Sequence, residues 1–160
     1  MSRGSAGEYQ ADERAGVARV NNTDDAQMLI STMLKEFLSI RNTGNELYYH
    51  GFMTGILGLA SATKNFRYLE EIESGTGFSD IIIDSFDNKT ACILELKKTE
   101  NLEDCYDAAQ AATKQIIQKN YAAKFISRRY KKVYGIGIGF AQKSCEIVSL
   151  GNLVEDSVNK

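Results

Sequence analysis

The stretch ILELKK at residues 93–98 alternates apolar side chains with charged ones. Successive side chains of a β-strand point to opposite faces of its sheet, so Glu95 and Lys97 share one face while Leu94 and Leu96 share the other. A solvated strand on the surface of a sheet produces this pattern without any function. A carboxylate followed two residues later by a lysine also suits a site that holds a divalent metal ion. The residues around the stretch are needed to choose between these interpretations.

An acidic strand is predicted directly before it. Residues 78–86 (FSDIIIDSF) place Asp80 and Asp84 on one face, and residues 87–89 (DNK) predict a hairpin turn. The strand at 90–98 is then antiparallel to 78–86, which brings both aspartates into the neighbourhood of the strand that carries Glu95. Mg²⁺ binds through one or two carboxylates and keeps several waters, and such an ion polarises a phosphodiester. The hairpin therefore supplies the parts of a metal-dependent hydrolytic site.

The other elements are predicted from hydrophobic periodicity and capping. A helix is expected after a cap at Asn22 or Thr23, and a second, well-buried helix over residues 46–62. A strand is expected at 66–73, a long amphipathic helix over 101–125, and strands at 132–141 and 144–150. The apolar faces expected for the first and the long helix comprise Met28, Leu29, Met33, Leu34 and Leu38, and Leu102, Tyr106, Ala109, Ala112, Ile116 and Tyr121, respectively.

This order, α-α-β-β-β-α-β-β, predicts an α/β fold with a mixed sheet flanked by helices, because a helix between strands makes a crossover connection. We expect residues 1–21 to be a flexible lead-in or linker, 22–150 to be one domain and 151–160 to be a C-terminal tail. The alternating glycines of GIGIGF at 135–140 predict a strand pressed closely against a helix. The run lacks the sequence of a phosphate-binding loop.

Composition narrows the class of protein. The 160 residues are 43% hydrophobic and 25% charged, as in a globular protein, and no apolar run approaches the length of a membrane span. Three cysteines without metal-ligand spacing argue against a disulfide framework or a zinc site, so we expect reduced thiols, a cytoplasmic location and no membrane partner. The net charge is −2, yet residues 114–143 contain no Asp or Glu. That basic segment suits contact with phosphates or a solvated helix end.

Four short motifs in this order resemble those of the PD-(D/E)XK nuclease superfamily. They are NE-x-x-YH (45–50), G-x-G-x-S-D (75–80), ILELK (93–97) and QI-x(4)-Y (115–121), and the resemblance covers residues 22–150. More narrowly, the chain resembles the nuclease-like domain found C-terminal to an AAA-ATPase-like region in bacterial proteins. The fold that this resemblance implies is restriction-endonuclease-like, in agreement with the element order.

The resemblance also implies a catalytic site. Asp80 and Glu95 would be the metal-binding carboxylates, with the carbonyl of Leu96 completing the coordination of Mg²⁺ or Mn²⁺. Lys97 would be the catalytic lysine. Glu46 matches an acidic residue of the first core helix that reaches the metal through water.

Further residues are expected around this centre. Gln115 and Tyr121 match the helix motif that positions nucleic acid or the lysine, and Lys114 and Lys119 are expected to bind substrate. Glu46 and His50 are four residues apart and so face the same side of a helix. His50 is interpreted as a hydrogen-bonding residue near the site, with a catalytic acid or base as the alternative. Asp84 is a further candidate for support.

One departure from the family's pattern affects the predicted activity. Relatives commonly carry an arginine two residues before the aspartate, where this chain has Phe78. This departure removes a phosphate-contacting cation and favours an inactive protein, but Asp80, Glu95 and Lys97 are all present. We expect a metal-dependent nuclease acting on nucleic acid, with DNA favoured. The alternative is an inactive module of the same fold that binds nucleic acid or a partner protein, or a sensor domain of an AAA-ATPase-like protein. A homodimer and an ATPase-like region or chain are the further partners that the resemblance suggests.

Overall fold

The computed structural model describes residues 23–37, 45–63, 66–74 and 77–158, and gives the backbone alone at 68–74, 77–79 and 156–158. Its strands are β1 (Arg67–Ser74), β2 (Gly77–Ser85), β3 (Thr90–Lys98), β4 (Lys132–Ala141) and β5 (Ser144–Asn152). Its helices are α1 (Thr23–Phe37), α2 (Glu46–Thr63), η2 (Leu102–Asp104), α3 (Cys105–Gln118), α4 (Ala123–Ser127) and α5 (Leu153–Val158). The predicted strands at 90–98 and 132–141 are confirmed residue by residue, and the other three within two residues at each end.

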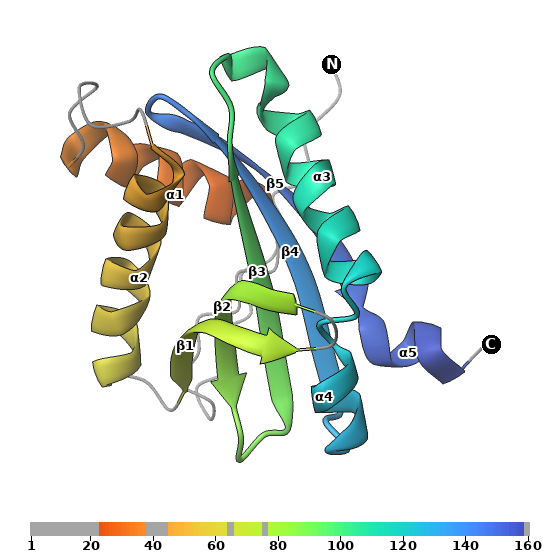
Figure 1. The fold of residues 1–160 in the computed structure, drawn as a ribbon. Coiled ribbons are helices and arrows are strands. Elements are labelled where there is room, and N and C mark those ends of the chain that lie inside the picture. Colours follow the sequence, from red (N-terminus) through yellow and green to blue (C-terminus); the bar gives the residue numbers. More distant parts are fainter. Residues whose placement is uncertain (1–22, 38–44, 64–65, 75–76, 159–160) are drawn as a thin grey trace, which may run out of the picture.

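The five strands form one mixed sheet in the order β1-β2-β3-β4-β5 (Figure 1). β3 and β4 are parallel, because α3 lies between them in the chain and returns it to the end of the sheet at which β3 begins. The other neighbouring pairs are antiparallel. The predicted hairpin between β2 and β3 is confirmed: Asp84 pairs with Ala91 and Ser85 with Thr90. The expected α/β architecture with a helical crossover is therefore what the chain adopts.

Helices cover both faces of the sheet (Figure 1). α1 and α2 lie on one face, over a core that includes Leu34, Tyr49, Leu96 and Phe140. α3, α4 and α5 lie on the other face, over a second core built around residues such as Ile93. The alternation of β3 explains this division: Leu94 and Leu96 serve the first core, and the side chains of odd-numbered residues face α3.

Two glycines let α3 approach the sheet closely. A Cβ at Gly137 would lie 2.2 Å from the carbonyl oxygen of Ala109, and one at Gly139 would lie 2.0 Å from that of Cys105. Both atoms belong to the α3 backbone and cannot move without the helix. The predicted close contact between the GIGIGF strand and a helix is thus confirmed. Because Gly137 pairs with Glu95 across β3 and β4, the close approach lies beside the charged stretch of β3.

The predicted long helix over 101–125 is wrong as a single element. It begins as the 3₁₀ turn η2, continues as α3 to Gln118, and resumes as α4 after a turn in which Asn120 has a φ of +52°. Tyr121 therefore lies in the turn and not on the helix. Leu102 and Tyr106, expected on the buried face, are each 51% exposed, whereas Ala109, Ala112 and Ile116 are buried as predicted.

The predicted apolar stripe of α1 is also partly wrong. Met28 and Leu29 are exposed, and the helix instead turns Ala26, Ile30 and Leu34 to the core. Gln27 fixes this rotation, because its side-chain oxygen accepts the backbone N–H of Ile147 at 3.0 Å and so satisfies an edge of β5. Leu38 lies outside the described residues.

α2 and the C-terminal segment differ from the prediction in similar ways. Only Tyr49 and Met53 of α2 are fully buried, and Leu59 is 75% exposed, so α2 is a surface helix. Residues 151–152 extend β5, and 153–158 form α5, from which Leu153 and Val154 pack on the second core. The expected C-terminal tail is therefore, as far as Val158, part of the fold. Among the described helices, none has the length and apolar character required to cross a membrane.

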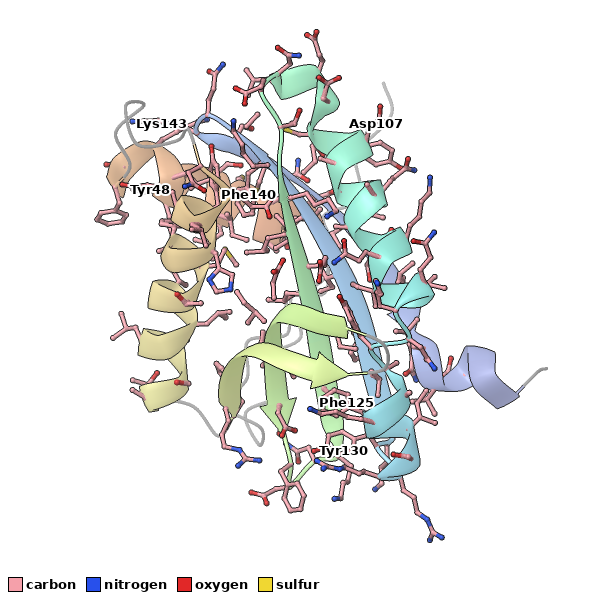
Figure 2. All side chains as sticks on the ribbon, viewed as in Figure 1. Tyr48, Asp107, Phe125, Tyr130, Phe140 and Lys143 are labelled. Atoms are coloured by element: carbon pink, nitrogen blue, oxygen red, sulfur yellow. The ribbon has the colours of Figure 1, made fainter. Side chains whose placement is uncertain are left out.

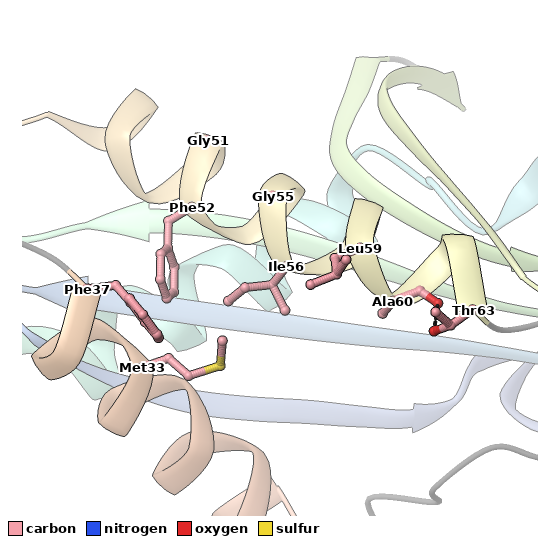
Figure 3. Close-up of a pocket in the computed structure, with 9 residues that line it drawn as sticks. All are labelled: Met33, Phe37, Gly51, Phe52, Gly55, Ile56, Leu59, Ala60 and Thr63. Carbon is pink, nitrogen blue, oxygen red and sulfur yellow. Dashed lines mark hydrogen bonds between the residues drawn. The ribbon is translucent and has the colours of Figure 1, made fainter.

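An apolar groove of about 560 Å³ lies between α1 and α2 (Figure 3). Met33 and Phe37 of α1 line one side, and Phe52, Ile56 and Leu59 of α2 line the other. Its lining residues among those that the structure describes carry no charge. The predicted site residues Asp80 and Glu95 lie outside this groove, on β2 and β3.

Candidate active site

Two carboxylates face each other where β2 begins and β3 ends. Ile81 pairs with Leu94, so the same antiparallel register places Asp80 opposite Glu95. Directly opposed residues of such a pair share a face and have Cβ atoms about 4.5–5.5 Å apart. The backbone N–H of Asp80 also donates a hydrogen bond to the Glu95 carboxylate. The predicted proximity of Asp80 and Glu95 is thus confirmed.

The Asp80 carboxylate takes part in the edge of β3. Its Oδ2 accepts the backbone N–H of Leu96 at 2.7 Å, in the place where a strand carbonyl would otherwise bind. The N–H and C=O of one strand residue point to the same edge, so the Leu96 carbonyl is directed to the Asp80 side as well. The Leu96 carbonyl therefore lies on the same side of β3 as the Asp80 carboxylate.

Gln115 of α3 joins the lysine to the glutamate. Its Oε1 accepts a hydrogen bond from Nζ of Lys97 at 2.9 Å, and its Nε2 donates to Oε1 of Glu95. The same Nε2 lies 3.3 Å from the Tyr121 hydroxyl, which accepts from it. An amide has one end that accepts and one that donates, so a cation on one side and a carboxylate on the other fix its orientation. Gln115 and Tyr121 are thus placed at the site, as expected.

Burial sets the electrostatics of the carboxylates. Glu95 is 3% exposed, and burial followed by the charge of Asp80 raises its pKa to about 8, although Lys97 and two hydrogen bonds act against this. Burial also raises the pKa of Asp80, and Glu46 adds to the increase, whereas the Leu96 N–H, His50 and Lys97 lower it. Oε2 of Glu95 is buried and has no hydrogen-bond partner among the described residues. The positive charge near the two carboxylates is therefore too small to offset their burial and mutual repulsion.

The first two turns of α2 approach the same strand ends from the other face of the sheet. Oε2 of Glu46 accepts the backbone N–H of Lys98 at 3.1 Å, and Nε2 of His50 lies 3.3 Å from the carbonyl oxygen of Asp80. The expectation that Glu46 and His50 face the same side is confirmed. Both contact the backbone of the strands that carry the carboxylates, so α2 is attached to the first half of β2 and to the last residue of β3.

The remaining candidates are Asp84, Lys114 and Lys119. Asp84 is at the opposite end of β2, where it accepts hydrogen bonds from the Tyr130 hydroxyl at 2.8 Å and from Arg67 at 3.2 Å. It therefore does not support the Asp80 site, because four strand residues span about 13 Å. Lys114 and Lys119 are exposed on and just after α3. The side chain of Phe78 is outside those that the structure describes.

Sequence reasoning missed two contacts that organise the site. One is the Leu96 N–H bound by Asp80, and the other is the bridging position of Gln115 between Lys97 and Glu95. The first was not visible because strand alternation describes side chains and not backbone donors. The second depends on how closely α3 lies over β3 and β4, for which the glycines of β4 were the available signal.

Comparison with known proteins agrees with this geometry. A family model described as the PD-(D/E)XK nuclease superfamily matches residues 44–150. The chain belongs to the PD-(D/E)XK nuclease superfamily. The match runs from the residue before Asn45 to the end of the predicted domain, and so includes all four motifs as well as Asp80, Glu95 and Lys97. No curated protein matches the chain.

Proposed function

We propose that this member of the superfamily is an active, divalent-metal-dependent nuclease that hydrolyses phosphodiester bonds of nucleic acid, with DNA as its substrate. The observation that supports the proposal most strongly is the pair of carboxylates opposed across β2 and β3: Asp80 is half-buried, and Glu95 is buried with one oxygen that has no partner among the described residues. Lys97 and Gln115 stand beside that pair. A structural ion pair would not need two neighbouring carboxylates that repel each other.

The donor set suits Mg²⁺ or Mn²⁺. Two carboxylates with a backbone carbonyl are all oxygen ligands, which hard cations prefer, and Mg²⁺ typically takes one or two protein carboxylates with water and substrate phosphate in its other positions. Within the described residues no three His, Cys, Asp or Glu side chains form a metal cluster. Asp80, Glu95 and the Leu96 carbonyl would hold the ion, and the orphaned Oε2 of Glu95 is free to bind it.

When bound, the ion supplies a polarised phosphoryl oxygen and a water of lowered pKa. The remaining steps belong to the side chains. Lys97, tethered to Gln115, presents its ammonium beside the two carboxylates, where it stabilises the additional negative charge of the transition state. Gln115 holds both Lys97 and Glu95, so the distance between the cation and the carboxylate is fixed before substrate arrives. Glu46 anchors α2 to β3 and limits movement of the strand end.

Adjacent lysines provide a matched test. Lys97 contacts Gln115 at the site, whereas Lys98 lies on the other face and its Nζ pairs with Glu100. With Mg²⁺ or Mn²⁺, the wild-type protein is expected to cleave DNA. Lys97→Gln should lower the rate by roughly 100-fold or more, and Lys98→Gln should leave it near that of wild type. Single- and double-stranded DNA and RNA are compared in the same assay.

The assay separates the proposal from its alternative. If none of the four nucleic acids is cut with either metal, the chain is an inactive module of the same fold. Equal losses in Lys97→Gln and Lys98→Gln would remove Lys97 from the chemistry. Cleavage of RNA alone would replace the DNA substrate with RNA. Association with an ATPase-like region and dimerisation stay predictions from the family resemblance, and a cytoplasmic location stays a prediction from the cysteine content.

A further inference from the structure

A cluster of cations lies at the end of the sheet remote from Asp80 and Glu95. We call it the basic end. Its members come from the β2–β3 turn, from α4, and from the turn that leads into β4: Lys89, Lys124, Arg128, Arg129, Lys131 and Lys132. The last four side chains are exposed, and none of these four enters an ion pair among the described residues. Residues 114–143 contain no Asp or Glu, whereas the β2–β3 turn that carries Lys89 also carries the exposed Asp87.

Backbone hydrogen bonds hold the two turns of the basic end together. The carbonyl oxygen of Lys89 accepts the N–H groups of Lys131 at 2.7 Å and Lys132 at 3.3 Å. The carbonyl of Phe125, at the middle of α4, accepts the N–H groups of Arg128 and Tyr130 at 3.1 and 3.0 Å. The cations therefore project from a fixed platform, and ordering them on a ligand costs less entropy than ordering a loose chain.

Tyr130 locks this platform to the sheet. Its ring meets that of Phe125 edge-on, with the ring centroids 5.1 Å apart (Figure 2). Its hydroxyl donates to the buried carboxylate of Asp84, which also accepts from Arg67. Tyr130 is only 4% exposed, so it is not available to stack on a base. Asp84, the buried carboxylate nearest to the cations along β2, already has two partners. The basic end thus presents charge without a reader of base identity.

The position of the basic end relative to the candidate active site is set by β3. Lys132 pairs with Thr90, and Glu95 is five residues further along the same strand. At about 3.3 Å per residue the two sites are roughly 17 Å apart. Phosphates of one strand of B-DNA are spaced by about 3.4 Å along the axis, so this separation corresponds to about five nucleotides. Lys119 lies between α3, which carries Gln115 of the candidate site, and α4, which carries Lys124 of the basic end.

We propose that the basic end binds the nucleic-acid backbone about five nucleotides from the phosphate at the Asp80–Glu95 site. This inference rests on the proposed function, because the five nucleotides are counted from the phosphate at the Asp80–Glu95 site. Binding to the basic end does not itself require cleavage. The partner is identified by charge complementarity: the four exposed cations between Arg128 and Lys132, fixed in place and with no Asp or Glu in residues 114–143, fit a repeating polyanion. Because cations contact phosphates and not base edges, the contact is independent of sequence.

A pair of matched double variants tests the surface. Arg128→Gln/Arg129→Gln removes two charges from the basic end. Lys35→Gln/Lys143→Gln removes two exposed or half-buried charges near the opposite end of the sheet, as the positions of Lys143 and Tyr130 in Figure 2 indicate. Lys143 there donates to the backbone carbonyl of Lys35, so both control residues belong to one patch. Neither control residue touches the candidate active site.

Binding is measured in EDTA, without cleavage, by the fluorescence anisotropy of a labelled DNA duplex of about two helical turns between about 50 and 200 mM salt. Loss of two phosphate contacts should reduce the slope of log K against log salt by up to about 1.8 and weaken binding by about tenfold or more at low salt. The control variant should keep the slope of the wild type. Thermal melts verify that both variants fold.

Equal slopes for wild type and Arg128→Gln/Arg129→Gln would overturn the inference, as would an equal decrease in the control variant. Vesicles containing phosphatidylserine form a second arm: loss of vesicle binding with unchanged DNA binding would identify a membrane surface instead and would also overturn it. Failure of the proposed function is distinguishable, because a protein that cuts nothing can still lose DNA affinity through Arg128 and Arg129. Conversely, if the protein cleaves DNA but its DNA affinity does not depend on Arg128 and Arg129, only the inference about the basic end is refuted.

Discussion

Gly137→Ala is the substitution whose effect follows most directly from the geometry. The added Cβ would lie 2.2 Å from the carbonyl oxygen of Ala109 and 2.9 Å from atoms of Thr113, whereas ordinary contacts begin at 3.4 Å. To restore 3.4 Å from 2.2 Å, α3 must withdraw by about 1.2 Å, because the clash is with its backbone. Overpacking of this kind costs about 1–3 kcal/mol, and more where the backbone must move.

The same displacement reaches the candidate site, because Gly137 pairs with Glu95 and α3 carries Gln115. We therefore expect Gly137→Ala to unfold at a lower temperature, by roughly 2–4 °C for each kcal/mol lost in a chain of this size, and to lose cleavage activity in the fraction that stays folded. Chemical denaturation and thermal melts give the stability, and the cleavage assay is run well below the transition.

Gly55→Ala is the matched control. Gly55 lies inside α2, and a Cβ there meets nothing within 4 Å, so alanine should stabilise the helix by up to about 1 kcal/mol and leave activity unchanged. If Gly137→Ala is as stable as the wild type, or if it loses no more activity than Gly55→Ala, the close approach of α3 does not position Gln115. The claim that the packing of α3 on β4 holds Gln115 between Lys97 and Glu95 would then be refuted.

Two further predictions concern the buried carboxylates. In metal-free protein, the unfolded chain ionises Glu95 near its ordinary pKa of 4.5 while the folded chain keeps it protonated to about 8, so the free energy of unfolding should fall as pH rises between these values and level off above. Glu95→Gln should remove that part of the slope in melts with EDTA, and an unchanged slope would exclude Glu95 as its source. Tyr130→Phe should cost about 1–3 kcal/mol, because it takes a hydroxyl donor from buried Asp84. Tyr134→Phe, whose hydroxyl has no hydrogen bond to the described residues, should cost less in the same urea titrations, and equal losses would contradict the role of Tyr130.

The strands were predictable because their signals are local. Alternation with period two, a DNK turn and paired glycines define β2, β3 and β4 without reference to the rest of the chain. The opposition of Asp80 and Glu95 follows from the length of that hairpin. Since the family's motif lies on these strands, its three charged residues could be placed together from sequence alone.

The helices were less predictable because tertiary contacts override their periodicity. Nothing in KNYAAKF forbids a continuous helix, yet the chain leaves it at Asn120, and Tyr121 packs in the core with its hydroxyl next to Gln115. α1 exposes Met28 because Gln27 binds the edge of β5 instead. Contacts between a side chain and a distant backbone group leave no periodic pattern, which also explains why the Leu96 N–H bond to Asp80 was not foreseen.

The central claim is that Asp80 and Glu95 hold a divalent ion, and a crystal structure of the chain soaked in Mn²⁺ tests it most directly. The account predicts an anomalous peak within about 2.6 Å of oxygens from both carboxylates, with the Leu96 carbonyl turned to the same ion. Crystals of Asp80→Asn soaked in the same way should lose the peak or show it weakened. A bound ion elsewhere in the chain, with Asp80 and Glu95 contacting only protein and water, would contradict the account.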